Sequence, residues 1–518
     1  MLSDWRKVFL VAPVFAFGSS GATLHNGPTF NTDVAPIIYE KCSRCHRPGE
    51  VAPFPLLTYN DVAKRAALIA AVVEKRIMPP WKPDPGPVPF LNEGRLSDEQ
   101  IATIRAWATS GAPEGDPAKR PPEPHFSGGW QFGEPDMVLP MPTSVHIPAE
   151  GADVYRCLVL PVDALKDRYV SAFEFRPGNR RVVHHAILFV DTSGVARKLD
   201  AETPEPGYTC VGGVGFPPRS TLGVFAPGWP MPPLPAGMAK SIPKGADVII
   251  QIHYHPSGKP EEDRSSLGLK FTSKPGKEIQ TVYVYRRQLD IPAGDPHHVE
   301  TFSSILPVDA DLVSIGPHAH YIAKDLVVEA HLPDQSMIRL VHIADWDFNW
   351  QGFYYYERPI RLPKGTEIRL RYAYDNSDQN PHNPLHPPQR MTYGERTTDE
   401  MELAILGVAP VGGVDSDSFR RSLMLMQLRQ LLQDNQDVTH IAETADTPRL
   451  KLLVRVFDRD HDGKLNESEE RAMLNFLDWS STHWPTIRAA TIMVLLLVVS
   501  GISFLVFKGV RRLAVRAR

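Results

Sequence analysis

The stretch KCSRCHRPGE, residues 41–50, places two cysteines three positions apart and a histidine directly after the second. This Cys-x-x-Cys-His spacing is typical of c-type haem attachment, in which both thiols bond to the haem and the histidine becomes an axial iron ligand. A zinc site would need a second pair of ligands, and a thioredoxin-like redox motif would need a βαβ setting. Neither is near, so we expect one covalent haem on Cys42 and Cys45, with His46 as an iron ligand.

The iron of such a haem needs a second axial ligand, and Met78 is the candidate. It lies in RIMPPWKP and is the only methionine between His46 and Met137. A lone methionine more often packs in a core, but here it is the single candidate. Helical spacing at 33–41, 61–75 and 98–109, with Ser97 as an N-cap, predicts an α-helical c-type cytochrome domain over residues 30–118.

After a proline-rich linker, the pattern changes to short runs typical of β-strands. They lie at 169–175, 181–190, 247–253, 325–331 and 367–374. This all-β region is too long for one small sandwich and suits two, which we expect over residues 130–275 and 276–412.

Most of the histidines that could bind a metal lie in this β region. His318 and His320 are two positions apart, so in a strand they would point to one face and could hold a single ion. His184 and His185 are adjacent, so they could share an ion only if the backbone bulges or the strand ends there. Each pair alone is more often ordinary surface or core polarity than a metal site.

The ordered set of these motifs resembles the type II copper, ascorbate-dependent monooxygenases, such as peptidylglycine α-hydroxylating and dopamine β-monooxygenase. That family carries a His-His pair, a Gln-x-His-Tyr segment, a His-x-His pair and a Met after Asp-Glu, in this order. The corresponding residues here are His184 and His185; Gln251, His253 and Tyr254; His318 and His320; and Asp399, Glu400 and Met401. The resemblance covers residues 134–410.

The resemblance implies two jelly-roll-like β-sandwich domains with one copper in each. By position, one copper would be held by His184, His185 and His253 and would supply electrons. The other, where O₂ reacts, would be held by His318, His320 and Met401, whose thioether favours Cu(I). Catalytic roles are implied for His318, His320, Met401 and Gln251. His255 is left out, because the family's ligand is the histidine two positions after the glutamine.

The implied activity is hydroxylation of a C–H bond of a small substrate with O₂. The fused haem, in place of ascorbate, would supply the electrons. Where the peptide-hydroxylating enzyme has arginine, asparagine and tyrosine for its substrate, this chain has Gly316, Leu403 and Ile405, so a neutral or apolar substrate is expected. The alternative is a membrane-anchored haem and copper electron-transfer subunit without oxygenase activity.

Two further motifs lie outside the haem and copper sets. Cys157 and Cys210 remain after haem attachment and are expected to form a disulfide. The segment DRDHDGKLNESEE, within a helical segment at 413–482, matches an EF-hand loop and predicts one Ca²⁺, although a solvated acidic helix junction would give a similar pattern. The expected calcium ligands are Asp458, Asp460, Asp462, Lys464, Asn466 and Glu469.

The two ends of the chain predict export and anchoring. Residues 1–22 read as a signal peptide, and 489–507 form an apolar stretch that as a helix would span about 28 Å of a hydrocarbon core of about 30 Å. A basic cytoplasmic tail follows. We expect a single-pass protein of a bacterial inner membrane, with its catalytic domains in the periplasm and a periplasmic or membrane electron donor.

Composition agrees with a multidomain globular protein. The chain has 518 residues, 42% of them hydrophobic, and a net charge of −4. With no basic run outside the tail, nucleic acid is not an expected partner. The expected fold class is therefore multidomain: a helical cytochrome, two β-sandwiches, a helical EF-hand segment and one transmembrane helix.

Overall fold

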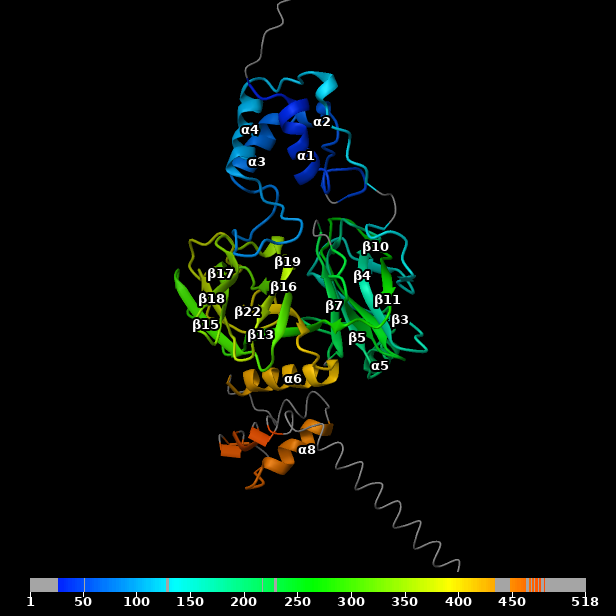
Figure 1. Ribbon diagram of the computed structural model, residues 1–518, viewed down its shortest axis with the longest axis vertical. Coiled ribbons are helices and arrows are strands. Elements are labelled where there is room, and N and C mark those ends of the chain that lie inside the picture. Colours follow the sequence, from blue (N-terminus) through cyan, green and yellow to red (C-terminus); the bar gives the residue numbers. More distant parts are fainter. Residues whose placement is uncertain are drawn as a thin grey trace, which may run out of the picture. The chain divides into compact units, whose positions relative to one another are not determined.

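Figure 1 shows the computed structural model, which describes residues 27–50, 52–126, 130–216, 218–227, 231–433, 448–462, 465–466, 468–469, 471–473, 475–476 and 479. The predicted signal peptide, the apolar stretch at 489–507 and the basic tail lie outside these residues. The described chain forms two compact units.

The first unit contains Phe54–Pro79, Leu96–Pro124 and the described residues up to Pro48. Its helices are short, and two of them, which start at Tyr59 and Asp98, have a capping box at the N-terminus. The Ser97 hydroxyl accepts the N–H of Gln100, whose side chain in turn accepts the N–H of Ser97. The elements are η1 (Phe30–Val34), α1 (Ala35–Lys41), α2 (Tyr59–Ala63), α3 (Ala66–Glu74), α4 (Asp98–Thr109) and η2 (Pro117–Lys119).

The second unit begins with two facing sheets that enclose one apolar core. Alternating residues of β3, β5 and β9, such as Leu158, Leu188 and Ile250, meet Phe173 and Leu269 of the opposite sheet. The elements are β1 (Met137–Pro140), β2 (Val145–Ile147), β3 (Val154–Pro161), β4 (Arg168–Arg176), β5 (Val183–Asp191), α5 (Val195–Ala201), β6 (Tyr208–Thr209), β7 (Ser220–Phe225), β8 (Met238–Ile242), β9 (Asp247–Tyr254), β10 (Glu261–Asp263), β11 (Ser266–Thr272) and β12 (Lys277–Glu278). The strand orders are β1-β11-β4-β8-β12 and β6-β3-β9-β5-β7, and β5 and β7 lie side by side in Figure 1.

A second pair of sheets comes next in the chain and encloses its own core. Leu312 and Leu406 of one sheet pack with Val328 and Leu370 of the other. The elements are β13 (Gln280–Arg286), β14 (Asp290–Ile291), β15 (His298–Ile305), β16 (Ala310–His318), β17 (Ala323–His331), β18 (Met337–Ile343), η3 (Phe348–Trp350), β19 (Tyr354–Leu362), β20 (Glu367–Tyr374), β21 (Met391–Thr392) and β22 (Glu402–Pro410). The strand orders are β13-β22-β16-β19 and β15-β20-β17-β18.

The segment Pro80–Arg95 belongs to the second unit, although it lies between helices of the first in sequence. Its backbone bonds to β19: the N–H of Leu91 donates to the Tyr355 carbonyl at 2.7 Å, and the N–H of Glu357 donates to the Pro89 carbonyl at 3.0 Å. Phe90 is buried and stacks on Tyr356. These bonds give a proline-rich segment the partners that it cannot find within itself.

After the sheets, the described residues include the helices α6 (Ser416–Gln433) and α8 (Pro448–Phe457). The side chain of Gln430 on α6 donates to the Tyr283 carbonyl of β13 at 3.0 Å and accepts the N–H of Tyr285 at 3.2 Å. These bonds satisfy backbone groups of β13, which is an edge strand and has no neighbouring strand on that side of its sheet.

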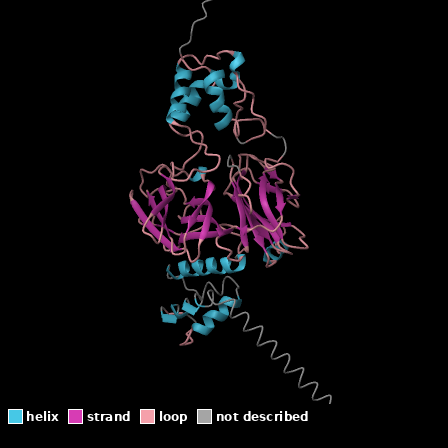
Figure 2. Cartoon of the chain, in the orientation of Figure 1, coloured by secondary structure: helices cyan, strands magenta, loops and turns pink. Residues whose placement is uncertain are grey.

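The predicted fold class, with its helical cytochrome domain, is wrong. Of the described residues, 33% lie in strands and 19% in helices, and these residues form no helical cytochrome domain. Strands make up most of the regular structure drawn in Figure 2. Within the described part of the chain, no helix is both long and apolar enough to cross a membrane. The helices near the N-terminus are short, and alternating runs rich in β-branched residues dominate the chain from Met137 to Pro410, so the described part of the protein has more strand than helix.

Candidate metal centres

His184, His185 and His253 come together on one face of the sheet that contains β5 and β9. His185 and His253 are directly opposite one another in the register of these strands. The register shifts between Val183 and His185, which is a β-bulge at His184. The bulge turns the side chain of His184 to the same side as its neighbour, so the ring centroids of the three histidines lie 4.8 to 5.4 Å apart.

The Nδ1 atoms of these rings converge at distances that suit one metal ion. His184 Nδ1 lies 3.2 Å from His185 Nδ1, and His253 Nδ1 lies 3.4 Å from His185 Nδ1. Two nitrogens bound to one ion at about 2.0 Å with a tetrahedral angle would be about 3.3 Å apart. The three side chains could therefore hold an ion through Nδ1 with little movement.

Burial keeps the imidazoles of His184 and His185 neutral, which is the form that binds metals. Burial, followed by the charge of His253, lowers the pKa of His184 to about 4. Burial also lowers the pKa of His185 well below its ordinary value, and charges on His253, His184 and His318 add to this pKa shift. The rings of His184 and His185 are thus unprotonated near neutral pH and can present lone pairs to an ion.

Two residues outside the predicted ligand set hold His253. Tyr155, opposite it on β3, stacks on its ring with centroids 4.3 Å apart and planes 7° apart. Asp153 lies 2.7 Å from His253 Nε2 and also 2.7 Å from Nδ1 of His255. Burial raises the pKa of Asp153, and bonds from the two histidines lower it, to about 2 overall. In the sequence, the His-x-His spacing of His253 and His255 is the one feature that could have indicated that both rings share a partner.

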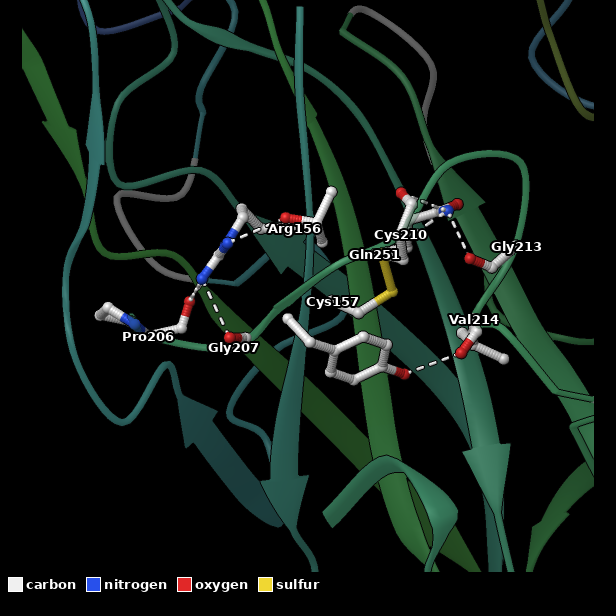
Figure 3. Close-up of a disulfide and its surroundings, with 10 residues drawn as sticks. Arg156, Cys157, Pro206, Gly207, Cys210, Gly213, Val214 and Gln251 are labelled. Atoms are coloured by element: carbon white, nitrogen blue, oxygen red, sulfur yellow. Dashed lines mark hydrogen bonds between the residues drawn. A yellow bond between two sulfur atoms is a disulfide. The ribbon is translucent and has the colours of Figure 1, made fainter. Parts of the chain in front are cut away.

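Gln251 lies two residues before His253 but bonds to a loop instead of the cluster. Its amide donates to the carbonyl of Gly213 at 3.1 Å, next to the disulfide (Figure 3). Its catalytic role stays a prediction. The predicted disulfide is confirmed: Cys157 and Cys210 are joined, with their Cα atoms 5.9 Å apart. A disulfide indicates an oxidising compartment.

The two histidines predicted for the second centre lie where β16 ends. His318 is the last residue of β16, and His320 lies just beyond it, with the two ring centroids 5.2 Å apart. Nδ1 of His318 is hydrogen-bonded to Gln351 at 2.5 Å and Nδ1 of His320 to the Asp399 carbonyl at 3.0 Å, so each ring has Nε2 left for an ion. Burial lowers the pKa of His318 to about 3 and the pKa of His320 to about 4.

Met401, the third predicted ligand, is buried and tied to the His320 segment through Glu400. One carboxylate oxygen of Glu400 accepts the backbone N–H groups of both Met401 and His320, and the other accepts that of Ile322. Burial raises the pKa of Glu400 to about 8, although the three N–H bonds lower it. Glu400 thus holds the backbone of two predicted ligands together.

The surface beside His318 is apolar. In the register of β16 and β22, Gly316 is opposite Ile405 and His318 is opposite Leu403, so the four share one face. A Cβ at Gly316 would lie 2.5 Å from the ring of Phe353, which therefore occupies the space next to the glycine. No charged side chain stands at these three family positions.

The Cys-x-x-Cys-His stretch comes directly after α1. Cys42 and Cys45 are both half-buried, and Nδ1 of His46 is hydrogen-bonded to the Phe54 carbonyl at 3.0 Å, which leaves Nε2 available. Burial, the largest effect, lowers the pKa of His46. Met78 lies beyond the end of α3, where its N–H donates to the Val72 carbonyl. Its role as a ligand stays a prediction.

The predicted calcium loop comes directly after α8. Carboxylates of Asp458, Asp460 and Asp462 lie within 4.8 Å of one another. Glu469 accepts the N–H of Arg459 at 2.7 Å and that of Asn466 at 3.0 Å. Lys464 lies outside the described residues. The arrangement keeps the acidic side chains of the loop together without identifying an ion.

Comparison with known proteins gives no family. No family model matches the chain, and no curated protein matches it. Among solved structures, the bacteriophage PM2 major capsid protein P2 shares 9% identity, with a TM-score of 0.19 over 44% of this chain and 100% of that chain. The infectious bursal disease virus VP2 subviral particle shares 10% identity, with a TM-score of 0.17 over 54% and 73% of the two chains. Scores this low carry no argument about fold or function.

Proposed function

We propose that this chain is a copper-dependent monooxygenase that hydroxylates a C–H bond of a small neutral or apolar substrate. The observation that carries the proposal is the convergence of three Nδ1 atoms, from His184, His185 and His253, at the spacing of ligands around one ion. A separate pair, His318 and His320, presents its Nε2 atoms. The first cluster would bind an ion through Nδ1 and the second through Nε2. This difference suits two ions with different tasks.

The residues fit copper by donor type. His184, His185 and His253 would hold one ion, and His318, His320 and Met401 the other, with imidazole serving both oxidation states and the thioether favouring Cu(I). Copper bound there would supply the one-electron chemistry that reaction with O₂ needs. In the net reaction, one oxygen atom enters the C–H bond and the other becomes water, which consumes two electrons and two protons from a donor.

The chain's own residues prepare both clusters. Burial keeps the imidazoles of His184, His318 and His320 neutral. Gln351 and the Asp399 carbonyl fix the rings of His318 and His320, and Glu400 ties the Met401 segment to them. Because none of these contacts needs a metal, the clusters would be ordered before the ion arrives.

The substrate class is inferred from the face that carries His318. Leu403 and Ile405 lie beside it, and Phe353 covers Gly316. An anionic group would find no partner at these positions, whereas an apolar molecule would displace water from them. The proposed substrate is therefore small and neutral or apolar.

Electrons would come from a haem c held by Cys42, Cys45 and His46, with Met78 as the second axial ligand. The bond between His46 Nδ1 and Phe54 supports this, because it leaves Nε2 for iron and fixes the ring. We further propose one Ca²⁺ at the loop of Asp458 and Glu469, and a periplasmic location, in keeping with the disulfide.

Metal analysis and oxygen consumption test the proposal. The full chain should contain copper, and ascorbate with a panel of apolar small molecules should give substrate-dependent O₂ uptake and a product labelled from ¹⁸O₂. Replacing His318 and His320 with Ala should abolish the product, while His331→Ala, at a histidine paired with Glu329 outside both clusters, should not. Bound copper with no labelled product would indicate an electron-transfer subunit. Absence of copper would refute both the monooxygenase and the copper electron-transfer subunit.

A further inference from the structure

Asp153 lies directly before β3, and each of its carboxylate oxygens is bonded to a different histidine. Oδ2 lies 2.7 Å from His253 Nε2, and Oδ1 lies 2.7 Å from His255 Nδ1. The exposed side-chain fraction falls from 71% at His255 to 29% at Asp153 and 2% at His253. The three residues form a hydrogen-bonded series from solvent to the cluster.

The carboxylate determines which nitrogen of His253 faces the other histidines. An ionised carboxylate only accepts hydrogen bonds, so a neutral His253 must carry its proton on Nε2. Its Nδ1 is then a lone pair, and this is the atom 3.4 Å from His185 Nδ1. Stacking on Tyr155 fixes the plane of the same ring. Tautomer and orientation are thus both set from outside the cluster.

We propose that Asp153 is a positioning residue of the metal centre, which holds His253 with Nδ1 directed at the ion, and that His255 supports the carboxylate from the solvent side. A carboxylate behind a ligating imidazole fixes its tautomer and makes it a stronger donor. His255 is thereby assigned a supporting role, because its Nδ1 is bonded to Asp153. The inference rests on the proposed function only in requiring that the cluster binds a metal.

The test measures Cu²⁺ binding to the full chain in a His318→Ala, His320→Ala background, so that the first cluster alone contributes. Asp153→Asn, which keeps the shape but not the charge, should bind Cu²⁺ about 10- to 100-fold more weakly. It should also change the copper hyperfine splitting in electron paramagnetic resonance. The matched control is Glu329→Gln, which alters another carboxylate–histidine pair, of 2.9 Å, away from the cluster. Equal affinity of the two variants would overturn the inference.

A measurement on the chain with native Asp153 decides the matter if Asp153→Asn does not fold. Electron spin echo modulation from the remote imidazole nitrogens of bound Cu²⁺ reports the hydrogen bond at the uncoordinated N–H. We expect one remote nitrogen whose N–H donates a strong hydrogen bond. The absence of such a nitrogen would refute the role of Asp153. If the unaltered cluster binds no copper, the proposed function itself fails; if it binds copper and Asp153→Asn behaves as the control, only this inference fails.

Discussion

His185 on β5 lies directly opposite His253 on β9, and their Nδ1 atoms are 3.4 Å apart. The neighbouring His184 joins them only because the strand bulges between Val183 and His185. Without the bulge, adjacent side chains would point to opposite faces of the sheet. The local irregularity therefore converts a histidine pair and a distant third histidine into one cluster.

Replacing His184 with Ala should remove the metal from the first cluster and leave the metal of the second cluster in place. Loss of one of three converging ligands should weaken Cu²⁺ binding by more than the roughly 10- to 100-fold typical of outer contacts. Metal analysis after dialysis, combined with electron paramagnetic resonance, measures this. His331→Ala is the control, and retention of all copper by His184→Ala would contradict the assignment.

The metal-free protein should lose stability as the pH falls from about 6.5 toward 4. Burial lowers the pKa of His184 to about 4 and that of His318 to about 3, so the unfolded chain binds more protons in this range. The free energy of unfolding therefore rises with pH there, by up to about 1.4 kcal/mol per unit for each such group.

Thermal unfolding across this pH range measures the slope. A variant with Ala at His184, His185, His318 and His320 should show a shallower slope, because the groups that titrate are gone. The His331→Ala control should keep the original slope. Identical slopes in all three proteins would mean that the clustered histidines are protonated when folded.

Removing the disulfide should destabilise the first pair of sheets. Changing Cys157 and Cys210 to Ala should lower the free energy of unfolding by about 2–5 kcal/mol. The bridge closes a sequence separation of 53 residues and lies in its own buried cluster, beside Gln251 (Figure 3). Urea unfolding measures the loss, and reducing the unaltered protein should reproduce it; an unchanged midpoint would contradict this role.

The sequence predicted the parts of the sites that depend on local spacing. The strand runs around His184, His253 and Val328 are found, and the disulfide is confirmed. Helix 98–109 with its Ser97 cap is also found, because capping is a local property.

Features that depend on distant contacts could not be predicted. Asp153 reaches His253 from 100 positions away, and nothing in its own neighbourhood indicates this. Phe90 is buried against Tyr356, so a segment that reads as a proline-rich loop belongs to the second unit. The predicted fold class is wrong because a short motif fixes only the residues next to it and leaves the surrounding domain undetermined.

Lys240 on β8 provides the last prediction. It is buried, and its ammonium donates to the Thr221 carbonyl at 2.7 Å and to the Thr281 hydroxyl at 3.4 Å. Burial lowers the pKa of Lys240 to about 7, from 10.5. Between these values the unfolded chain binds the extra proton, so stability should rise from pH 7 toward pH 10, by up to about 1.4 kcal/mol per unit. Lys240→Met, which keeps the length without the charge, should remove this rise in thermal unfolding scans. Lys270→Met, at a half-exposed lysine paired with Asp136, should keep the rise, and an equal rise in both variants would show that Lys240 stays protonated in the folded protein.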